Sequence, residues 1–410
     1  MMNLHSPKHI RKFADLTKDL CKDGSSSLQY LALKMLFEFF FNQYDSVSDL
    51  IRQNAWTMSE SHFFRTILGF EGSRFLRRMR RSILKKYKGQ LNPKDFILAL
   101  DDTDNPRYSK YLSHVQSWRS SKGMYYGQKV LVLALVNVND GFCIPVDFKF
   151  CVPKKEQKKD GKDNALELAF EMIMKASSSF KGIYVVADSW FDCSNLAKKL
   201  DKRKIVFIWE LKSTRKAKIQ NDLFEKYFFL KELFCSLVRI CVNSSKNKWI
   251  SESVIRLNSN KIIVKAIAAY NRKNGKDPFA FYASTDKSMP GERVWKIFRA
   301  RWNIECLFRD LKSYLNLGRL STSSDKVNEL ALVFPFVIIT YLRLNPNAFG
   351  LKENMTVSTM IKTLRFEQEN VTIDLLLKKK SLSQIAKLKI RRAKINKKPV
   401  IQAVEEKLVA

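Results

Sequence analysis

The chain has 410 residues, 45% of them apolar, which is long enough for one large domain or several ordinary ones with their own cores. Its 74 lysines and arginines outnumber 40 aspartates and glutamates, and the net charge of +34 indicates a polyanionic partner. The seven cysteines form no CxxC pair and the four histidines have no metal-ligand spacing, which argues against a disulfide framework or a zinc site. Charge alone leaves a ribosomal or membrane-surface protein open.

The sequence lacks the features of an exported or membrane-spanning chain. Its first residues, MMNLHSPKHIRKF, contain no apolar core of a signal peptide. The longest apolar stretch, residues 330–342, contains Pro335 and is shorter than a membrane span. We therefore expect a soluble, cytoplasmic protein.

Residues 1–90 are predicted to form a helical N-terminal DNA-binding region. Residues 47–54 and 59–70 read as two short helices with a tight connection, a pattern that resembles a helix-turn-helix, although a hairpin that merely packs gives the same pattern. Residues 74–88 form a basic amphipathic helix, RFLRRMRRSILKKYK. Such charge density favours a position beside phosphate over a merely solvated face.

After residue 92 the pattern becomes strand-like. Residues 95–102 are a short apolar run that ends in carboxylates, and residues 129–150 read as two long strands joined at residues 139–141. A helix, a buried strand ending at Asp188, a second helix and the strand IVFIWELK follow. This order predicts an α/β fold in which helices flank a mixed sheet. Residues 212–285 alternate apolar and polar residues, which predicts an inserted β-rich region.

The C-terminal third returns to helix. Residues 291–315 predict one long helix, and residues 330–344 predict a second, apolar one. The last part, residues 346–410, reads as a basic helical C-terminal region whose contacts are expected to be with phosphate.

Two aspartates follow buried strands, and a glutamate lies on the long helix. Asp102 and Asp188 stand where strands run out into turns, and the carboxyl ends of strands form the ligand crevice of open α/β sheets. Either aspartate alone could be a turn former. On the helix, one stripe carries four side chains, which an ion-paired surface helix would also explain: Phe298, Arg301, Glu305 and Lys312.

Taken together, these residues resemble the DDE transposases of bacterial insertion sequences, in the insertion-sequence-four branch marked by a Tyr-x2-Arg-x3-Glu-x6-Lys signature. The resemblance covers residues 96–317 and implies a ribonuclease H-like catalytic domain, here residues 91–345 with its β-rich insertion. It implies catalytic carboxylates at Asp102, Asp188 and Glu305, with Asp102 chosen over Asp101 because it precedes Thr103. Phe298 occupies the place of the signature tyrosine, keeping the ring and losing the hydroxyl.

The chemistry implied is metal-dependent cleavage and strand transfer at the inverted-repeat ends of an insertion sequence. Three carboxylates suit Mg²⁺, for which Mn²⁺ can substitute, and two such ions can activate the attacking oxygen and stabilise the leaving one. Arg301 and Lys312 would hold the phosphates of double-stranded DNA, with Phe298 beside them, and the family implies a homodimer that pairs two ends. The alternatives are a ribonuclease H-like nuclease without strand transfer and a catalytically inactive, transposase-derived DNA-binding protein.

Overall fold

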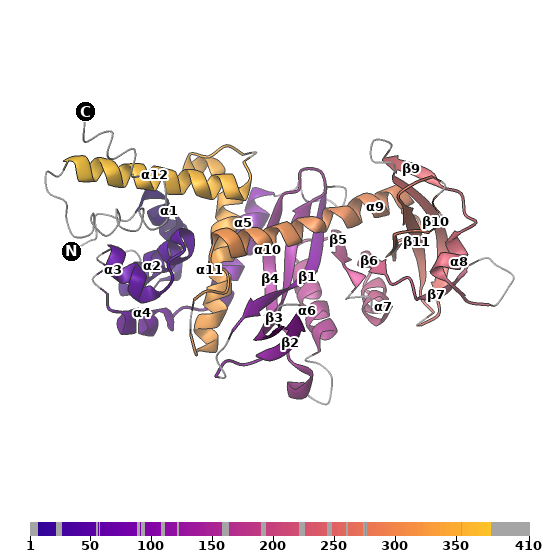
Figure 1. Ribbon diagram of the computed structural model, residues 1–410, viewed down its shortest axis with the longest axis horizontal. Helices are drawn as coiled ribbons and strands as arrows, with labels where there is room; N and C mark the ends of the chain where they lie inside the picture. Colours follow the sequence, from indigo (N-terminus) through magenta and orange to yellow (C-terminus); the bar gives the residue numbers. More distant parts are fainter. Residues whose placement is uncertain are drawn as a thin grey trace. The chain divides into compact units, whose positions relative to one another are not determined.

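The fold was examined in a computed structural model of the chain (Figure 1). It describes residues 7–378, except for residues 22–26, 55, 57, 88–90, 92–94, 108–110, 121–122, 158–163, 190–193, 221–225, 244–247, 260, 274, 276, 321 and 354. The chain forms two compact units, one containing residues 1–83, 109–113 and 309–410, and the other residues 84–108 and 114–308. The predicted division into three regions stays a prediction, and residues 379–410 of its C-terminal region lie outside the described residues.

The first unit is helical. Its N-terminal part contains α1 (Lys8–Thr17), α2 (Leu28–Asn42), α3 (Val47–Asn54), α4 (Glu60–Ile67) and α5 (Gly72–Lys86), so the helices predicted from the sequence form. Ser27 and Ser59 cap α2 and α4, each accepting a hydrogen bond from a backbone N–H three residues later. The C-terminal part adds α11 (Asp325–Leu344) and α12 (Val357–Lys378).

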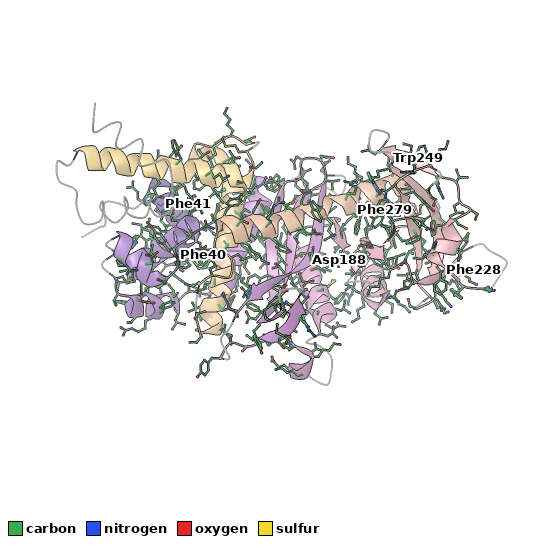
Figure 2. The ribbon with its side chains drawn as sticks, viewed as in Figure 1. Phe40, Phe41, Asp188, Phe228, Trp249 and Phe279 are labelled. Atoms are coloured by element: carbon green, nitrogen blue, oxygen red, sulfur yellow. The ribbon has the colours of Figure 1, made fainter. Side chains whose placement is uncertain are left out.

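An aromatic core holds this helical unit together. Phe334 of α11 packs against Phe37, Phe40 and Phe75, with ring centroids 5.1 to 6.3 Å apart. Figure 2 labels Phe40 and its neighbour Phe41 among these helices. By length and composition α11 could cross a membrane, but 89% of its apolar window is buried inside the protein. Its apolar surface is therefore accounted for by packing, with Pro335 kept inside the helix.

The second unit is built on one mixed sheet (Figure 1). Its strands lie in the order β2-β3-β1-β5-β6-β12-β11-β10-β7-β8, with β4 beside β3 and β9 beside β10. The central strands β1 (Phe96–Pro106), β5 (Tyr184–Ala187) and β6 (Phe207–Leu211) are parallel to one another. The remaining pairs are antiparallel: β2 (Gln116–Ser120), β3 (Gly123–Asn137), β4 (Cys143–Phe150), β7 (Lys216–Ile219), β8 (Phe228–Phe229), β9 (Ile240–Asn243), β10 (Lys248–Leu257), β11 (Ile263–Tyr270) and β12 (Ala280–Ser284).

The β-rich region predicted for residues 212–285 extends this sheet. β12 pairs with β6, and β11, β10, β7 and β8 follow outward, while the short helix α8 (Leu230–Phe234) lies within the same stretch. The predicted hairpin of residues 129–150 is also present, because β3 and β4 pair across a turn at residues 138–142. At that turn Gly141 adopts a φ of 73°, which a glycine reaches without steric cost.

Helices cover the sheet as the α/β pattern predicts. α6 (Ala165–Ser177) packs on β3 and β4, and α7 (Ser194–Lys202) packs on β6 and on α6. α9 (Gly291–Ala300) lies over β5, β6 and the antiparallel strands β10 to β12. The mixed sheet flanked by helices expected from the sequence is therefore confirmed.

One predicted helix is divided in two. The single helix expected over residues 291–315 consists of α9 and α10 (Trp302–Tyr314), separated at Arg301. At the junction the backbone makes tighter bonds, from Arg301 N to Phe298 O and from Ile304 N to Arg301 O, each spanning three residues. This local tightening changes the direction in which side chains on either side of Arg301 project, so the single stripe predicted for an ideal helix does not apply here.

Candidate active site

Three acidic residues follow one another across the parallel strands of the sheet. Leu100 of β1 pairs with Ala187 of β5, and Ala187 pairs with Trp209 of β6. The next residue along each strand is acidic: Asp101, Asp188 and Glu210. Because paired residues of parallel strands point to the same face, these three carboxylates form a row on one face, directly after β5 and near the end of β6. Figure 2 labels Asp188 in this position. Asp101 lies in the middle of β1, which continues to Pro106, so the strand does not end at Asp102 as the sequence predicted.

Arg301 joins this row to the helix above it. Its Nη1 donates to Asp101 Oδ2 at 2.6 Å, and its Nη2 donates to Glu305 Oε1 at 2.7 Å. Burial raises the pKa of Asp101 to about 7, although the Arg301 charge opposes the shift, and the nearby charge of Asp188 raises it further. Residues more than 100 positions apart in the sequence thus meet around one guanidinium.

Asp102 points the other way. Neighbouring side chains alternate between the faces of a strand, so Asp101 and Asp102 project from opposite sides of β1. Asp102 Oδ2 accepts a hydrogen bond from Lys129 Nζ of β3 at 3.0 Å. Burial lowers the pKa of Lys129, but the hydrogen bond and charge of Asp102 outweigh it and raise the pKa overall. The contacts of the described residues therefore bring Asp101, and not Asp102, to Arg301 and Glu305.

Phe298 is a packing residue at the end of α9. Its side chain is only 8% exposed, and its ring lies 4.2 Å from the ring of Tyr282 on β12, measured between centroids. The guanidinium of Arg301 lies 5.6 Å from the centroid of Phe298. Tyr282 pairs with Glu210 across β12 and β6, so its ring continues the acidic row. Phe298 thus stands between Tyr282 and Arg301 and supports both.

Lys312 lies on α10, seven residues beyond Glu305, and its side chain is exposed. It belongs to the helical unit, whereas Arg301 and Glu305 belong to the sheet unit. Its part in the site therefore rests on its spacing along the sequence.

The donor atoms near Arg301 are of the kind that a divalent ion takes. Asp101, Asp188 and Glu305 offer carboxylate oxygens, which are the preferred ligands of Mg²⁺. As the side chains stand, no three His, Cys, Asp or Glu residues of the described chain are close enough together to hold an ion. The Arg301 guanidinium is bonded to both Asp101 and Glu305, so an ion sharing those two carboxylates would have to take its place.

Two members of the cluster were missed by reasoning from the sequence. Glu210 is the one charged residue within the apolar strand FIWEL, and Tyr282 lies in the similarly apolar AFYAS. Glu210 could have been found from the sequence, because it is the one carboxylate in the apolar strand that comes after β5 and Asp188. Tyr282 gave no such signal, because its place beside Glu210 depends on the pairing of β6 with β12 across the inserted region.

A family model of known proteins matches the part of the chain that contains these residues. The family model described as "Transposase DDE domain" matches residues 93–341, more than half of the sequence. A search of curated proteins finds no match. Among solved structures, the cryo-EM structure of a piggyBac transposase synaptic complex with hairpin DNA is similar over 95% of this chain and 83% of that one, at 12% identity and a TM-score of 0.46. The range matched by the family model includes β1, β5, β6, α9 and α10.

Proposed function

The chain belongs to the transposase DDE domain family, and from this premise we propose that it cuts DNA at the inverted-repeat ends of an insertion sequence and joins them to target DNA. We place it in the insertion-sequence-four branch with a ribonuclease H-like catalytic domain, on the spacing of Arg301, Glu305 and Lys312. The net charge of +34 supports a DNA partner, because phosphate contacts release counterions.

The observation that carries the proposal is the meeting of carboxylates from three segments. Asp101 of β1 and Glu305 of α10 share the guanidinium of Arg301, and the charge of Asp188, next to β5, acts on Asp101. Converging carboxylates repel one another, so such a cluster is stable only with a cation or a proton among them. Metal-dependent cleavage of a phosphodiester uses carboxylate oxygens of this kind.

We propose Asp101, Asp188 and Glu305 as the metal-binding set. The resemblance assigns the first position to Asp102, and that assignment is the alternative. Asp101 is preferred because it shares Arg301 with Glu305, whereas Asp102 is paired with Lys129. Mg²⁺ or Mn²⁺, when bound, would supply the positive charge that activates the attacking oxygen and stabilises the leaving one.

The cationic residues of this region hold DNA. The planar guanidinium of Arg301 suits two-point binding of a phosphate, and Lys312 provides a single exposed ammonium on α10, the helix that begins after Arg301. Phe298 positions Arg301 by contact with its guanidinium. It lacks the hydroxyl with which the signature tyrosine could bind a DNA phosphate. The partner is double-stranded DNA, as transposon ends and as target, and a cytoplasmic homodimer would pair two ends.

The test compares neighbouring aspartates that carry the same substitution. Purified Asp101→Asn, Asp102→Asn and Glu305→Gln variants are incubated with the flanking DNA of the element and Mg²⁺ or Mn²⁺. Loss of a metal ligand is expected to lower cleavage by about a thousandfold, since each 1.4 kcal/mol of lost stabilisation is about tenfold in rate. Asp101→Asn and Glu305→Gln should show this loss, while Asp102→Asn stays within about tenfold, and all three should still shift end DNA in a gel.

Each outcome has a clear meaning. If Asp102→Asn abolishes cleavage and Asp101→Asn does not, the assignment by resemblance is right and ours is wrong. If every variant cuts as well as the unchanged chain, the site is elsewhere. Joining of a pre-cut end to plasmid DNA separates a transposase from a nuclease, and light scattering of the protein with end DNA measures the dimer.

A further inference from the structure

Glu210 is an acidic residue of the site to which the proposed chemistry gives no role. It lies in the row with Asp101 and Asp188, on the strand between β5 and β12. Its side chain is partly buried, and it makes no hydrogen bond or ion pair with any residue that the structure describes. A carboxylate left without a partner in a partly buried strand is unfavourable, so a partner that reaches it under some condition is expected.

Arg301 has a donor that no described residue accepts. Its side chain is 11% exposed, and its buried Nε–H has no hydrogen-bond partner within the described part of the chain. Burial raises the pKa of Glu210, while the positive charge of Arg301 lowers it and the charge of Asp188 raises it. The Phe298 ring lies 5.6 Å from the Arg301 guanidinium and 4.2 Å from the ring of Tyr282, which pairs with Glu210, so the guanidinium lies close to Glu210 while it is bonded to Asp101 and Glu305.

We infer that Glu210 is a positioning residue that receives the Arg301 guanidinium when a divalent ion takes the oxygens of Asp101 and Glu305. This inference rests on the proposed metal-dependent function. The ion and the guanidinium compete for the same two carboxylates, and neither cation can be left unpaired in a buried site at low cost. Glu210 gives Arg301 a second carboxylate within the same row, so ion binding does not leave a buried guanidinium without a partner.

The same exchange keeps Arg301 close to the reacting phosphate. A guanidinium held by Glu210 keeps donors free on its other edge, because five N–H groups are available in a fixed fork. Tyr282, which pairs with Glu210 in the strand register and contacts the ring of Phe298, borders the position that the guanidinium would reach. Arg301 would then be ordered rather than displaced into solvent.

A rival explanation is that Glu210 is itself a ligand of the ion. The two explanations differ in how Glu210 depends on Arg301, which a double-mutant cycle measures. If Glu210 acts through Arg301, removing Arg301 removes the effect of Glu210. If Glu210 binds the ion directly, its removal weakens binding whether or not Arg301 is present.

The experiment measures Mn²⁺ binding to the full chain by calorimetry at pH 7.5, without DNA. The variants are Glu210→Gln, Arg301→Gln and the double variant Glu210→Gln with Arg301→Gln. Glu171→Gln is the matched control. Glu171, on α6, is an exposed carboxylate of the same unit, and it pairs with Lys149 of β4. Melting curves confirm folding, and Glu210→Asp, which keeps the charge, guards against a loss caused by misfolding.

We expect Glu210→Gln to weaken Mn²⁺ binding by about three- to tenfold, the range for one partly exposed charge pair. Glu210→Asp should restore affinity to within about twofold, and Glu171→Gln should change nothing. Arg301→Gln should bind Mn²⁺ at least as tightly as the unchanged chain, and adding Glu210→Gln to it should have no further effect.

Three results would overturn the inference in distinguishable ways. Unchanged affinity in Glu210→Gln removes Glu210 from the site and leaves the proposed function standing. An equal loss with and without Arg301 makes Glu210 a direct ligand and ends its role as a partner of Arg301. If the protein without substitutions does not bind Mn²⁺, both the proposed metal-dependent function and this inference are wrong.

Discussion

The two halves of the sheet carry opposite chemistry. The parallel centre, β1, β5 and β6, places carboxylates in register on one face. The antiparallel half, from β12 to β8, instead places lysines over aromatic rings, such as Lys216 over Phe229 at 4.7 Å and Lys261 over Tyr227 at 4.4 Å. Residues 212–285 contain fifteen lysines and arginines against five aspartates and glutamates. Figure 2 labels three of the aromatic residues, Phe228, Trp249 and Phe279, in this half.

The difference follows from strand direction. The parallel strands β5 and β6 end at a common edge beside Asp101 of β1, so their acidic residues lie close together, whereas antiparallel strands alternate their ends. Convergence suits a site that must concentrate negative charge around a cation. A spread of positive charge and exposed rings suits contact with a long polyanion, because phosphates and bases recur along it. We therefore expect the antiparallel half to add DNA contacts to those proposed for Arg301 and Lys312.

The largest expected effect contrasts two acidic residues of the same row. Asp188→Asn should lower cleavage by about a thousandfold, because Asp188 is in the converging half. Glu252 lies in that row on β10, where it pairs with Lys265 at 2.8 Å. Glu252 also accepts a hydrogen bond from Gly291 N at the start of α9, so Glu252→Gln should cost about 1 to 3 kcal/mol of stability and keep cleavage within about tenfold. Single-turnover cleavage and thermal melting measure both, and equal losses of cleavage would erase the distinction between the halves.

A second prediction concerns the pH dependence of stability. Folding raises the pKa of Asp101 from 3.8 to about 7, chiefly through burial. A carboxyl whose pKa rises on folding stabilises the folded chain fully below about pH 4, and this contribution is lost as pH increases toward 7. The free energy of unfolding should therefore fall across that range by up to about 4 kcal/mol more than in Asp101→Asn. Urea unfolding of both chains measures the difference, and parallel pH profiles would contradict it.

A third prediction tests the basic half. Replacing Lys216 and Lys218 of β7 by alanine should weaken binding to end DNA and reduce the slope of log affinity against log salt by about two. Cleavage in the saturated complex should not change, because β12, β11 and β10 separate β7 from β6 and the proposed metal-binding residues. Lys149→Ala is the control, since Lys149 is already paired with Glu171 at 2.8 Å. A slope unaltered in the double variant would show that β7 does not contact DNA.

The smallest expected effect is that of Phe298→Tyr. The ring of Phe298 is held between Tyr282 and Arg301, and a hydroxyl added to it changes little of this packing. Cleavage should stay within about threefold of the unchanged chain or rise. A large loss would show that the ring fits its surroundings too tightly for the added oxygen.

Much of the fold could be predicted from the sequence, because the apolar residues of its strands and helices recur at regular spacings. The buried strand before Asp188, the hairpin of residues 129–150 and the apolar helix with Pro335 all appear where predicted. The break at Arg301 was missed, since residues 291–315 have no glycine or proline inside them to interrupt a helix, apart from the glycine at the start. The tighter bonds there depend on packing that local sequence does not encode.

The site was harder to predict than the fold. The alternation of side chains along a strand predicts that Asp101 and Asp102 face opposite ways, but it does not predict which of them meets Arg301 and Glu305. Glu210 looked like an isolated charge, because its alignment with Asp188 depends on pairing between separate strands. The role of Asp102 stays a prediction until cleavage by the Asp101→Asn and Asp102→Asn variants is compared.

The pairing of β6 with β12 has a consequence for how this chain can change. These strands are antiparallel neighbours, so the stretch between them leaves the sheet and returns to the adjacent position. Residues can be gained or lost within that excursion without shifting β1, β5 or β6 along their axes. The antiparallel half can therefore be lengthened, shortened or replaced while the acidic row stays in register, which makes it the natural place for related chains to diverge.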